Sequence, residues 1–324
     1  MKYSIYQVAK IIDAMPTDLN ETAISILLTD SRQVFFPDET LFFALKTKNN
    51  DGHRYISELY ELGVRNFVVS DLQPEWEEYE DANFLVVVNT LFALQRLAAY
   101  HRNQFNVPVI GITGSNGKTV VKEWLYQVLH HDFNITHSPR SYNSQIGVPL
   151  SVWQMNTHTQ LGIFEAGVSQ PEEMAKLEAI INPTIGIFTN IGQAHQEGFK
   201  SMKQKCLEKL ELFINCDVII CEEENELVDE CMEIACLSHK RLTWSRKGSN
   251  KSPLHIMKVE KLGNCTTIHY SILGMASQFT IPFADNAAIE NAIHVLATAI
   301  YLHLSLPDIN QRMAGLEPVA MRLD

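Results

Sequence analysis

A glycine-rich stretch at residues 107–119 has the residue types and the spacing that hold phosphate groups. Its apolar start is typical of a buried strand, and its last two residues, Lys118 and Thr119, would open a helix. Glycines leave the backbone N–H groups of such a loop free to surround an anion at the helix N-terminus. Lys118 would reach the outer phosphates of a nucleotide, and the Thr119 hydroxyl would bind Mg²⁺.

The glycine spacing differs from that of the general nucleotide-binding loop. That loop reads Gly-x-x-x-x-Gly-Lys-Thr, and this chain has Ile112 in place of the first glycine. From Gly111 the glycines instead run Gly-x-x-Gly-x-x-Gly-Lys-Thr. A glycine-rich turn without a ligand is the alternative, which the apolar strand before the loop and the Lys-Thr pair after it disfavour.

Three further groups could carry chemistry, because functional side chains gather at the carboxyl ends of strands in a parallel sheet. Glu165 directly follows a predicted strand, where a carboxylate would suit Mg²⁺; an exposed loop acid is the alternative. His195 lies in the loop after the next predicted strand and could bind a metal or orient phosphate, or have no such role. Lys205 and Lys209 lie one turn apart on a predicted helix. Their spacing does not show which of them has a functional role, and the alternative is that both are solvated surface lysines.

Two polar stretches stand out in the first hundred residues. They are Thr29-Asp-Ser-Arg32 and Asp51-Gly-His53. Each can be read as a turn, because Asp, Ser and Gly favour turns, or as part of a ligand site.

The elements around these residues predict an α/β protein. Residues 1–104 read as a small α/β unit with strands near 41–45, 66–70 and 84–88. From residue 107 strands and helices alternate, which indicates a mostly parallel sheet. After Trp244 the apolar period changes to two, which indicates antiparallel strands at the sheet edge, and a long apolar helix follows near 287–303.

Bulk composition excludes several classes of function. The net charge of −12 disfavours a nucleic-acid or anionic-membrane surface, although one local positive loop is enough for a phosphate ligand. The six cysteines form no Cys-x-x-Cys pair, so neither a zinc site nor a disulfide framework is expected. No apolar run has the length of a signal peptide or a membrane span, so we expect a cytoplasmic protein.

The order of these pieces resembles the Mur ligase family, and most closely its D-alanyl-D-alanine-adding branch. The resembling segments cover nearly the whole chain: 30–32, 41–45, 51–53, 111–119, 143–150, 165–167, 195–199 and 209–213. The glycine spacing that departs from the general loop matches the ATP loop of this family. The chain departs from the family at Ala287 and Ala288, which replace a His and an Asn before Asn291.

The resemblance implies a role for each matched residue. ATP would contact Gly114, Ser115, Asn116, Gly117, Lys118, Thr119, Asn291 and Arg322. One Mg²⁺ would be held by Thr119 and Glu165 and a second by His195 and Lys209, with Lys209 carbamylated as in the family. Lys118, His195 and Lys209 would be the catalytic residues. The substrate would meet Ser31 and Arg32 through its UDP portion, and Asn143 and Ser144 elsewhere.

The implied activity is ATP-dependent ligation of D-Ala-D-Ala to UDP-MurNAc-tripeptide through an acyl-phosphate. The implied domains are a UDP-sugar-binding domain at 1–104, a central P-loop ATPase domain at 105–320, and the start of a hinge at 321–324. A C-terminal domain of the same parent chain would follow, so the 324 residues are expected to be a monomer that is inactive alone. The parent could be fused to an alanine racemase. Alternatives are a diamino-acid-adding or folylpolyglutamate-type ligase of the same superfamily, or a nucleotide-binding module without turnover.

Overall fold

The computed structural model describes residues 1–15, 18–47, 49–192, 196–248 and 252–319. The chain forms two compact units. Unit 1 comprises Met1–Phe105 and Val152–Thr157, and unit 2 comprises Asn106–Ser151 and the chain from His158 onward.

Unit 1 is built on a four-stranded parallel sheet in the order β3-β4-β5-β6. Its core packs apolar side chains of the sheet, among them Phe42 and Phe67, against Ile56 and Leu59 of a helix. Gly63, with φ +93°, follows that helix. The elements are β1 (Tyr3–Ser4), α1 (Ile5–Ile11), β2 (Ala23–Ile24), β3 (Ile26–Leu28), β4 (Thr40–Phe43), α2 (Ile56–Glu61), β5 (Asn66–Val69), β6 (Asn83–Val86) and α3 (Thr90–Arg102).

Unit 2 is built on a nine-stranded sheet in the order β15-β14-β13-β12-β11-β10-β7-β9-β8. The strands from β8 to β13 pair in parallel, and β13, β14 and β15 pair antiparallel. The predicted mostly parallel sheet with an antiparallel edge is confirmed. The strands are β7 (Val109–Thr113), β8 (Ile135–His137), β9 (Leu161–Glu165), β10 (Ile185–Phe188), β11 (Val218–Glu222), β12 (Arg241–Ser245), β13 (Leu254–Leu262), β14 (Cys265–Ile272) and β15 (Met275–Ile281).

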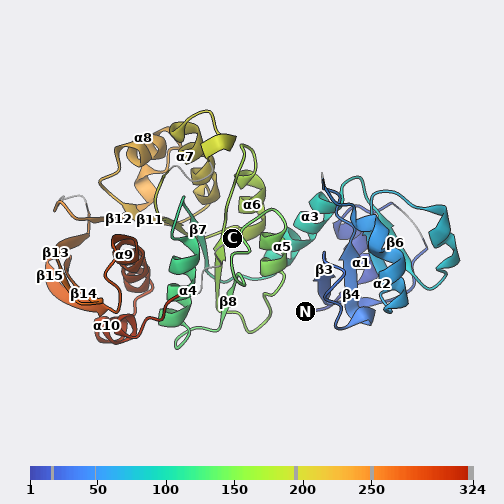
Figure 1. The fold of residues 1–324 in the computed structure, drawn as a ribbon, viewed down its shortest axis with the longest axis horizontal. Coiled ribbons are helices and arrows are strands. Elements are labelled where there is room, and N and C mark those ends of the chain that lie inside the picture. The colour runs from blue at the N-terminus through green and yellow to red at the C-terminus, as the bar shows by residue number, and fades with distance from the viewer. Residues whose placement is uncertain (16–17, 48, 193–195, 249–251, 320–324) are drawn as a thin grey trace. The chain divides into compact units, whose positions relative to one another are not determined.

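The helices of unit 2 pack in two groups. In the first, α4 contacts α9 and α10 over the sheet, and Figure 1 shows the antiparallel strands beside α9 and α10. In the second, α7 packs on α8, and the short helical turn that follows α7, Glu211–Phe213, packs on α6. The helices are α4 (Lys118–Leu129), α5 (Gly147–Val152), α6 (Met174–Ile181), α7 (Met202–Leu210), α8 (Glu226–Ile234), α9 (Asn286–Tyr301) and α10 (Leu306–Ala314).

The register of the central strands brings three chain segments to one edge of the sheet. β7 lies between β9 and β10, with Ile112 opposite Glu165 and Thr113 opposite Phe188. Because these strands are parallel, the loops that follow all three leave at the same carboxyl edge. The glycine-rich loop, Glu165 and the segment after β10 are therefore neighbours.

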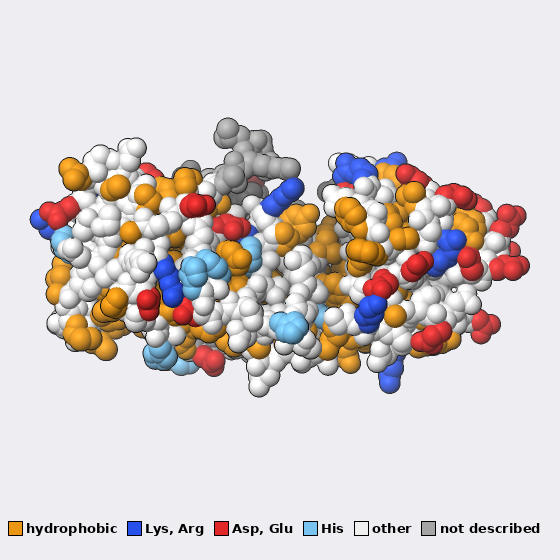
Figure 2. Space-filling view, turned by 90° about the horizontal axis from the view of Figure 1, so that it is seen from below, with side chains coloured by type: hydrophobic (Ala, Val, Ile, Leu, Met, Phe, Trp, Pro, Cys, Tyr) orange, Lys and Arg blue, Asp and Glu red, His pale blue; other side chains and the backbone are white. Residues whose placement is uncertain are grey.

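Surface charge is uneven, and acidic side chains gather at one end of unit 1 (Figure 2). The segment around the buried Trp76 carries exposed acids there in the sequence Pro74-Glu-Trp-Glu-Glu-Tyr-Glu-Asp81.

Across the part of the chain that the structure describes, none of the helices has the length and apolarity needed to traverse a bilayer.

Candidate active site

The glycine-rich loop joins β7 to α4 with a backbone that only glycine accommodates at two positions. Gly114 has φ +147° and Gly117, the residue before the helix, has φ +83°. A Cβ on Gly114 would lie 1.9 Å from Thr189 Oγ1, and one on Gly117 would lie 2.3 Å from Asn291 Oδ1. Close packing on both sides therefore fixes the loop at the N-terminus of α4, where helix geometry favours an anion.

The segment after β10 holds this loop in place. The N–H of Ser115 donates to Asn190 O at 2.8 Å, and the N–H of Asn116 donates to Asn190 Oδ1 at 3.0 Å. Ser115 Oγ accepts from the N–H of Gly192 at 2.8 Å, and Thr189 Oγ1 donates to Asn116 O at 2.6 Å. Asn190 was not among the residues predicted in this segment, where only His195 was expected to have a role. An amide side chain directly after a buried strand is the signal that could have indicated it.

A buried histidine supports the same segment from α9. His294 Nε2 donates to Thr189 O at 3.1 Å, and His294 Nδ1 accepts from Trp244 Nε1 at 3.4 Å. Both ring nitrogens are thus used in the neutral form, and burial lowers the pKa of His294 to about 4. Sequence analysis missed this residue, since one histidine in an apolar helix gives no signal for a loop far away in the chain.

Three lysines contact the glycine-rich loop and the segment after β10 that holds it. Lys118 Nζ and Lys209 Nζ each donate to Gly114 O at 3.1 Å, and Lys205 Nζ donates to Gly192 O. Burial, together with the neighbouring ammonium groups of Lys118 and Lys205, lowers the pKa of Lys209 to about 7. Burial also lowers the pKa values of Lys118 and Lys205. Such a cluster of cations on one loop suits a polyanionic ligand such as a triphosphate.

Lys209 is oriented by its neighbour on α7. The Glu208 carboxylate accepts from the backbone N–H groups of Glu172 at 3.0 Å, Glu173 at 2.9 Å and Met174 at 2.8 Å. It therefore caps the start of α6 and fixes the rotation of α7. The predicted alternative of two solvated lysines is wrong, since Lys205 is fully buried and Lys209 is nearly so.

Thr119 and Glu165 form a pair of oxygen ligands beside the loop. Thr119 Oγ1 donates to Glu165 Oε2 at 2.9 Å, and Glu165 is 0% exposed. Glu165 Oε1 is buried and accepts no hydrogen bond among the described residues, and the Lys122 ammonium lies 3.4 Å from it. A hydroxyl and a carboxylate are the hard oxygen donors that Mg²⁺ prefers, so the residues present fit this ion. The alternative of an exposed loop acid is wrong for Glu165.

The remaining residues singled out from the sequence stand as follows. Asn143 Nδ2 lies 3.4 Å from Glu165 Oε2, so Asn143 is next to the Thr119–Glu165 pair. Ser144 Oγ accepts from the N–H of Gly147 at 3.1 Å and so lies at the start of α5. Asn291 is buried against Gly117. Two predicted site residues, His195 and Arg322, lie outside the described residues.

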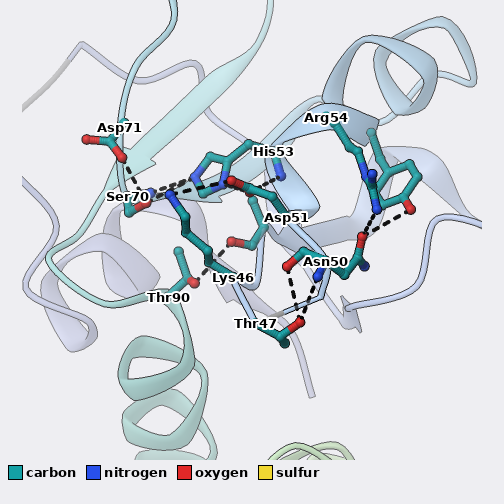
Figure 3. A network of polar contacts seen from close by, with 11 residues as sticks. Lys46, Thr47, Asn50, Asp51, His53, Arg54, Ser70, Asp71 and Thr90 are labelled. Atoms are coloured by element: carbon teal, nitrogen blue, oxygen red, sulfur yellow. Dashed lines mark hydrogen bonds and ion pairs between the residues drawn. The ribbon is translucent and has the colours of Figure 1, made fainter.

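Unit 1 has its own polar cluster at the carboxyl edge of its sheet, shown in Figure 3. His53 Nδ1 donates to Asp51 Oδ1 at 2.6 Å, and His53 Nε2 accepts from the N–H of Ser70 at 3.0 Å. A Cβ on Gly52 would lie 2.8 Å from Leu45 N, so this position needs glycine. The motif thus ties the loop after β4 to the end of β5. The Ser70 hydroxyl also lies 3.2 Å from His53 Nε2, so both the backbone and the side chain of Ser70 contact this ring nitrogen.

The loop after β3 carries the other predicted contact residues of unit 1. Arg32 makes two hydrogen bonds to the Asp30 carboxylate, Nε to Oδ1 at 2.8 Å and Nη2 to Oδ2 at 2.6 Å. This pairing lowers the pKa of Asp30. Ser31 lies between them in the turn. The Arg32 side chain is 84% exposed, so its guanidinium remains accessible to a ligand.

The model of the Mur ligase middle domain matches residues 112–299. The chain belongs to the Mur ligase family. The resemblance inferred from the sequence is therefore confirmed, and the match includes the second half of the phosphate loop, Glu165, Lys209 and Asn291.

Known proteins similar to the chain point to one branch of this Mur ligase family. The UDP-N-acetylmuramoyl-tripeptide–D-alanyl-D-alanine ligase of Bacillus subtilis is 28% identical over 307 residues, which cover 94% of this chain and 64% of that protein. The ligase of the same name from Rickettsia prowazekii is 32% identical over 262 residues, 79% of this chain and 57% of that protein. A crystal structure of MurF from Acinetobacter baumannii has a TM-score of 0.87 at 25% identity and covers 100% of this chain and 70% of its own.

Coverage of these relatives is partial. The chain spans 64% of the length of the Bacillus subtilis ligase and 57% of the Rickettsia prowazekii ligase. A MurF structure from Thermotoga maritima in complex with ADP shares the fold, with a TM-score of 0.78 at 21% identity over 91% of this chain and 66% of its own.

Proposed function

We propose that this Mur ligase chain belongs to an enzyme that adds D-Ala-D-Ala to UDP-MurNAc-tripeptide with hydrolysis of ATP. The observation that carries the proposal is the phosphate loop with Lys118, Lys209 and the Thr119–Glu165 oxygen pair at one edge of the sheet. The relatives named for this reaction support the choice of substrates. A Mur-type ligase with another acceptor is the alternative within the superfamily.

The residues of unit 2 then divide the work of phosphoryl transfer. The loop backbone from Gly114 to Gly117 and the Lys118 ammonium bind the ATP phosphates and compensate their charge. Mg²⁺, held by Thr119 and Glu165, neutralises phosphate charge when it is bound. A carboxylate oxygen of the peptide attacks the γ-phosphorus and ADP leaves. The amine of D-Ala-D-Ala then attacks the acyl carbon, inorganic phosphate leaves, and the amine gives up a proton.

We further propose that Lys209 is carbamylated and binds a second Mg²⁺ together with His195. A lysine must be uncharged to attack CO₂, and a pKa of about 7 makes the neutral amine abundant at physiological pH. The carbamate is an anion, so its formation would also relieve the repulsion between Lys209 and the ammonium groups of Lys118 and Lys205. Asn291 and Arg322 complete the proposed ATP contacts.

For unit 1 we propose UDP-sugar binding at the carboxyl edge of its parallel sheet. Ser31 and Arg32 would contact the UDP portion, while Asn143 and Ser144 of unit 2 would also face the substrate. Domain limits of 1–104 and 105–320, a hinge from 321, a further C-terminal domain of the parent protein, a monomeric state and a cytoplasmic location belong to the same proposal. The greater length of the relatives supports the further domain.

The first test is nucleotide binding by this chain. ADP with Mg²⁺ is titrated calorimetrically into the wild type, into Lys118→Ala and into Lys176→Ala, a control at an exposed lysine of α6. We expect binding by the wild type and the control and roughly tenfold or greater weakening in Lys118→Ala, since a charge-assisted phosphate contact is lost. Equal affinity in all three proteins would contradict the assignment of the loop.

The second test is phosphate release from ATP by a protein extended to the length of the relatives. We expect release only when UDP-MurNAc-tripeptide and D-Ala-D-Ala are both present. Turnover with a glutamate or diamino-acid acceptor instead would keep the family and refute the proposed substrates. ADP binding without release under any acceptor would favour a nucleotide-binding module.

A further inference from the structure

Lys122 is a fully buried lysine beside the carboxylate that we assign to Mg²⁺. It lies one helical turn after Thr119 on α4, and its side chain is 0% exposed. Its Nζ atom lies 3.4 Å from Glu165 Oε1 and 2.9 Å from Glu123 Oε1. A cation buried to this extent is costly unless it is paired and hydrogen-bonded, so its surroundings indicate what it does.

The same ammonium group holds the loop that follows β8. Lys122 Nζ donates to Ser138 O at 2.7 Å and also to Arg140 O. Arg140 has φ +50°, a left-handed conformation that is unfavourable for a residue other than glycine, asparagine or aspartate. The hydrogen bond to its carbonyl therefore stabilises a backbone shape that the loop would not keep unaided.

This loop returns to the oxygen pair within a few residues. Ser141 Oγ lies 3.3 Å from Thr119 Oγ1, and Asn143 Nδ2 lies 3.4 Å from Glu165 Oε2. Lys122 is thus the one side chain among those described here that contacts both the Glu165 carboxylate and the backbone of the 138–140 loop. It approaches Glu165 from the Oε1 side, while Thr119 and Asn143 approach Oε2.

We propose that Lys122 is a positioning residue of the metal site, which holds the Glu165 carboxylate and the 138–143 loop in the arrangement that receives Mg²⁺. The inference rests on the proposed function and adds a residue to which no part of that function was assigned. Among the described residues, Lys122 forms its hydrogen bonds and ion pairs outside the glycine-rich loop, so its removal should impair metal binding and leave metal-free nucleotide binding intact. A lysine that only fills the interior would instead change stability alone.

The test compares Lys122→Met and Lys122→Gln with Glu123→Gln. Methionine removes the charge and the hydrogen-bond donor, whereas glutamine removes the charge and keeps an N–H donor for the loop carbonyls. If the methionine variant does not fold, the glutamine variant is used for the comparison. Glu123→Gln is the matched control, because Glu123 pairs with the same ammonium group and, among the described residues, makes no hydrogen bond to Glu165. Binding of Mn²⁺ is measured by electron paramagnetic resonance in the presence of ADP, binding of ADP without metal by calorimetry, and folding by thermal denaturation.

We expect roughly tenfold or greater weakening of Mn²⁺ binding in the Lys122 variants, the range seen when residues that orient metal ligands are removed. Metal-free ADP affinity should stay within about twofold, and the Glu123→Gln control should bind Mn²⁺ like the wild type. Unchanged Mn²⁺ affinity with a lower melting temperature in the Lys122 variants would overturn the inference. Tighter Mn²⁺ binding in these variants would also overturn it, because it would show that the Lys122 ammonium only repels the metal ion. Failure of the wild type to bind Mn²⁺ with ADP would instead overturn the proposed function, and the inference with it.

Discussion

The neutral state of His294 predicts a specific loss of stability in mild acid. Its pKa of about 4 in the folded chain lies below the ordinary value of 6.5 that it regains on unfolding. Between these two values the unfolded chain binds more protons than the folded chain, so the free energy of unfolding falls as the pH falls. From pH 7.5 to pH 5.0 this one residue should lower the free energy of unfolding by about 2 kcal/mol.

The assay is urea unfolding at both pH values, followed by tryptophan fluorescence and circular dichroism. Wild type is compared with His294→Gln and with His131→Gln, a control at an exposed histidine. His294→Gln will be less stable at both pH values, because Thr189 O and Trp244 Nε1 lose their partner. The informative quantity is therefore the change between the two pH values, which should be smaller by about 2 kcal/mol in His294→Gln and unaltered in the control.

An equal pH dependence in wild type and His294→Gln would refute the reasoning. Because His294 stays neutral in the folded chain at pH 5.0, its hydrogen bond to Thr189 O persists there, and the effect of acid is confined to the free energy of unfolding. His101 in unit 1 has the same burial-lowered pKa of about 4, and it makes an independent contribution that remains in the variant.

Three further predictions follow from the geometry. Gly114→Ala should weaken ADP binding, measured by calorimetry, roughly tenfold or more, because φ is +147° and a Cβ would overlap Thr189 Oγ1. An affinity equal to that of the wild type would contradict the close packing at this position. In CO₂-free buffer the free energy of unfolding of the wild type should rise by about 2 kcal/mol from pH 7 to pH 9, because Lys209 loses its proton in the folded chain and keeps it in the unfolded chain. Lys209→Met should show no such rise. The same pH dependence of urea unfolding in both proteins would exclude the lowered pKa. His53→Gln should lower the free energy of unfolding of unit 1 by about 1–3 kcal/mol, because the N–H of Ser70 loses its acceptor. UDP binding should weaken as well. Unaltered urea midpoints would show that the hydrogen bond between His53 and Ser70 is dispensable.

Sequence periodicity predicted most of the sheet in unit 2, because its strands are long apolar runs between helices. It missed β8 and α5 for physical reasons. β8 is a short edge strand whose residues Ile135–His137 are all half-buried, so it has no clear apolar period. α5 contains a proline and β-branched residues that disfavour a helix, and it forms where Ser144 Oγ meets the N–H of Gly147.

Within the site, sequence found the residues whose place is set by local chain order. Lys118 and Thr119 follow directly from the loop, and Glu165 follows from the rule that functional groups end parallel strands. Lys122 and His294 could not be predicted, because their roles depend on which carbonyl oxygens the fold brings to a buried side chain. Such contacts leave no periodic trace in the sequence.

The convergence of three lysines on two backbone carbonyls links the stability of unit 2 to its ionic surroundings. Lys118 and Lys209 share Gly114 O, while Lys205 bonds to Gly192 O. Like charges held at this spacing repel one another in the folded chain and separate on unfolding, so any multivalent anion that settles among them stabilises the fold by mass action. A bound polyphosphate would therefore raise the free energy of unfolding of unit 2, and its removal would lower it.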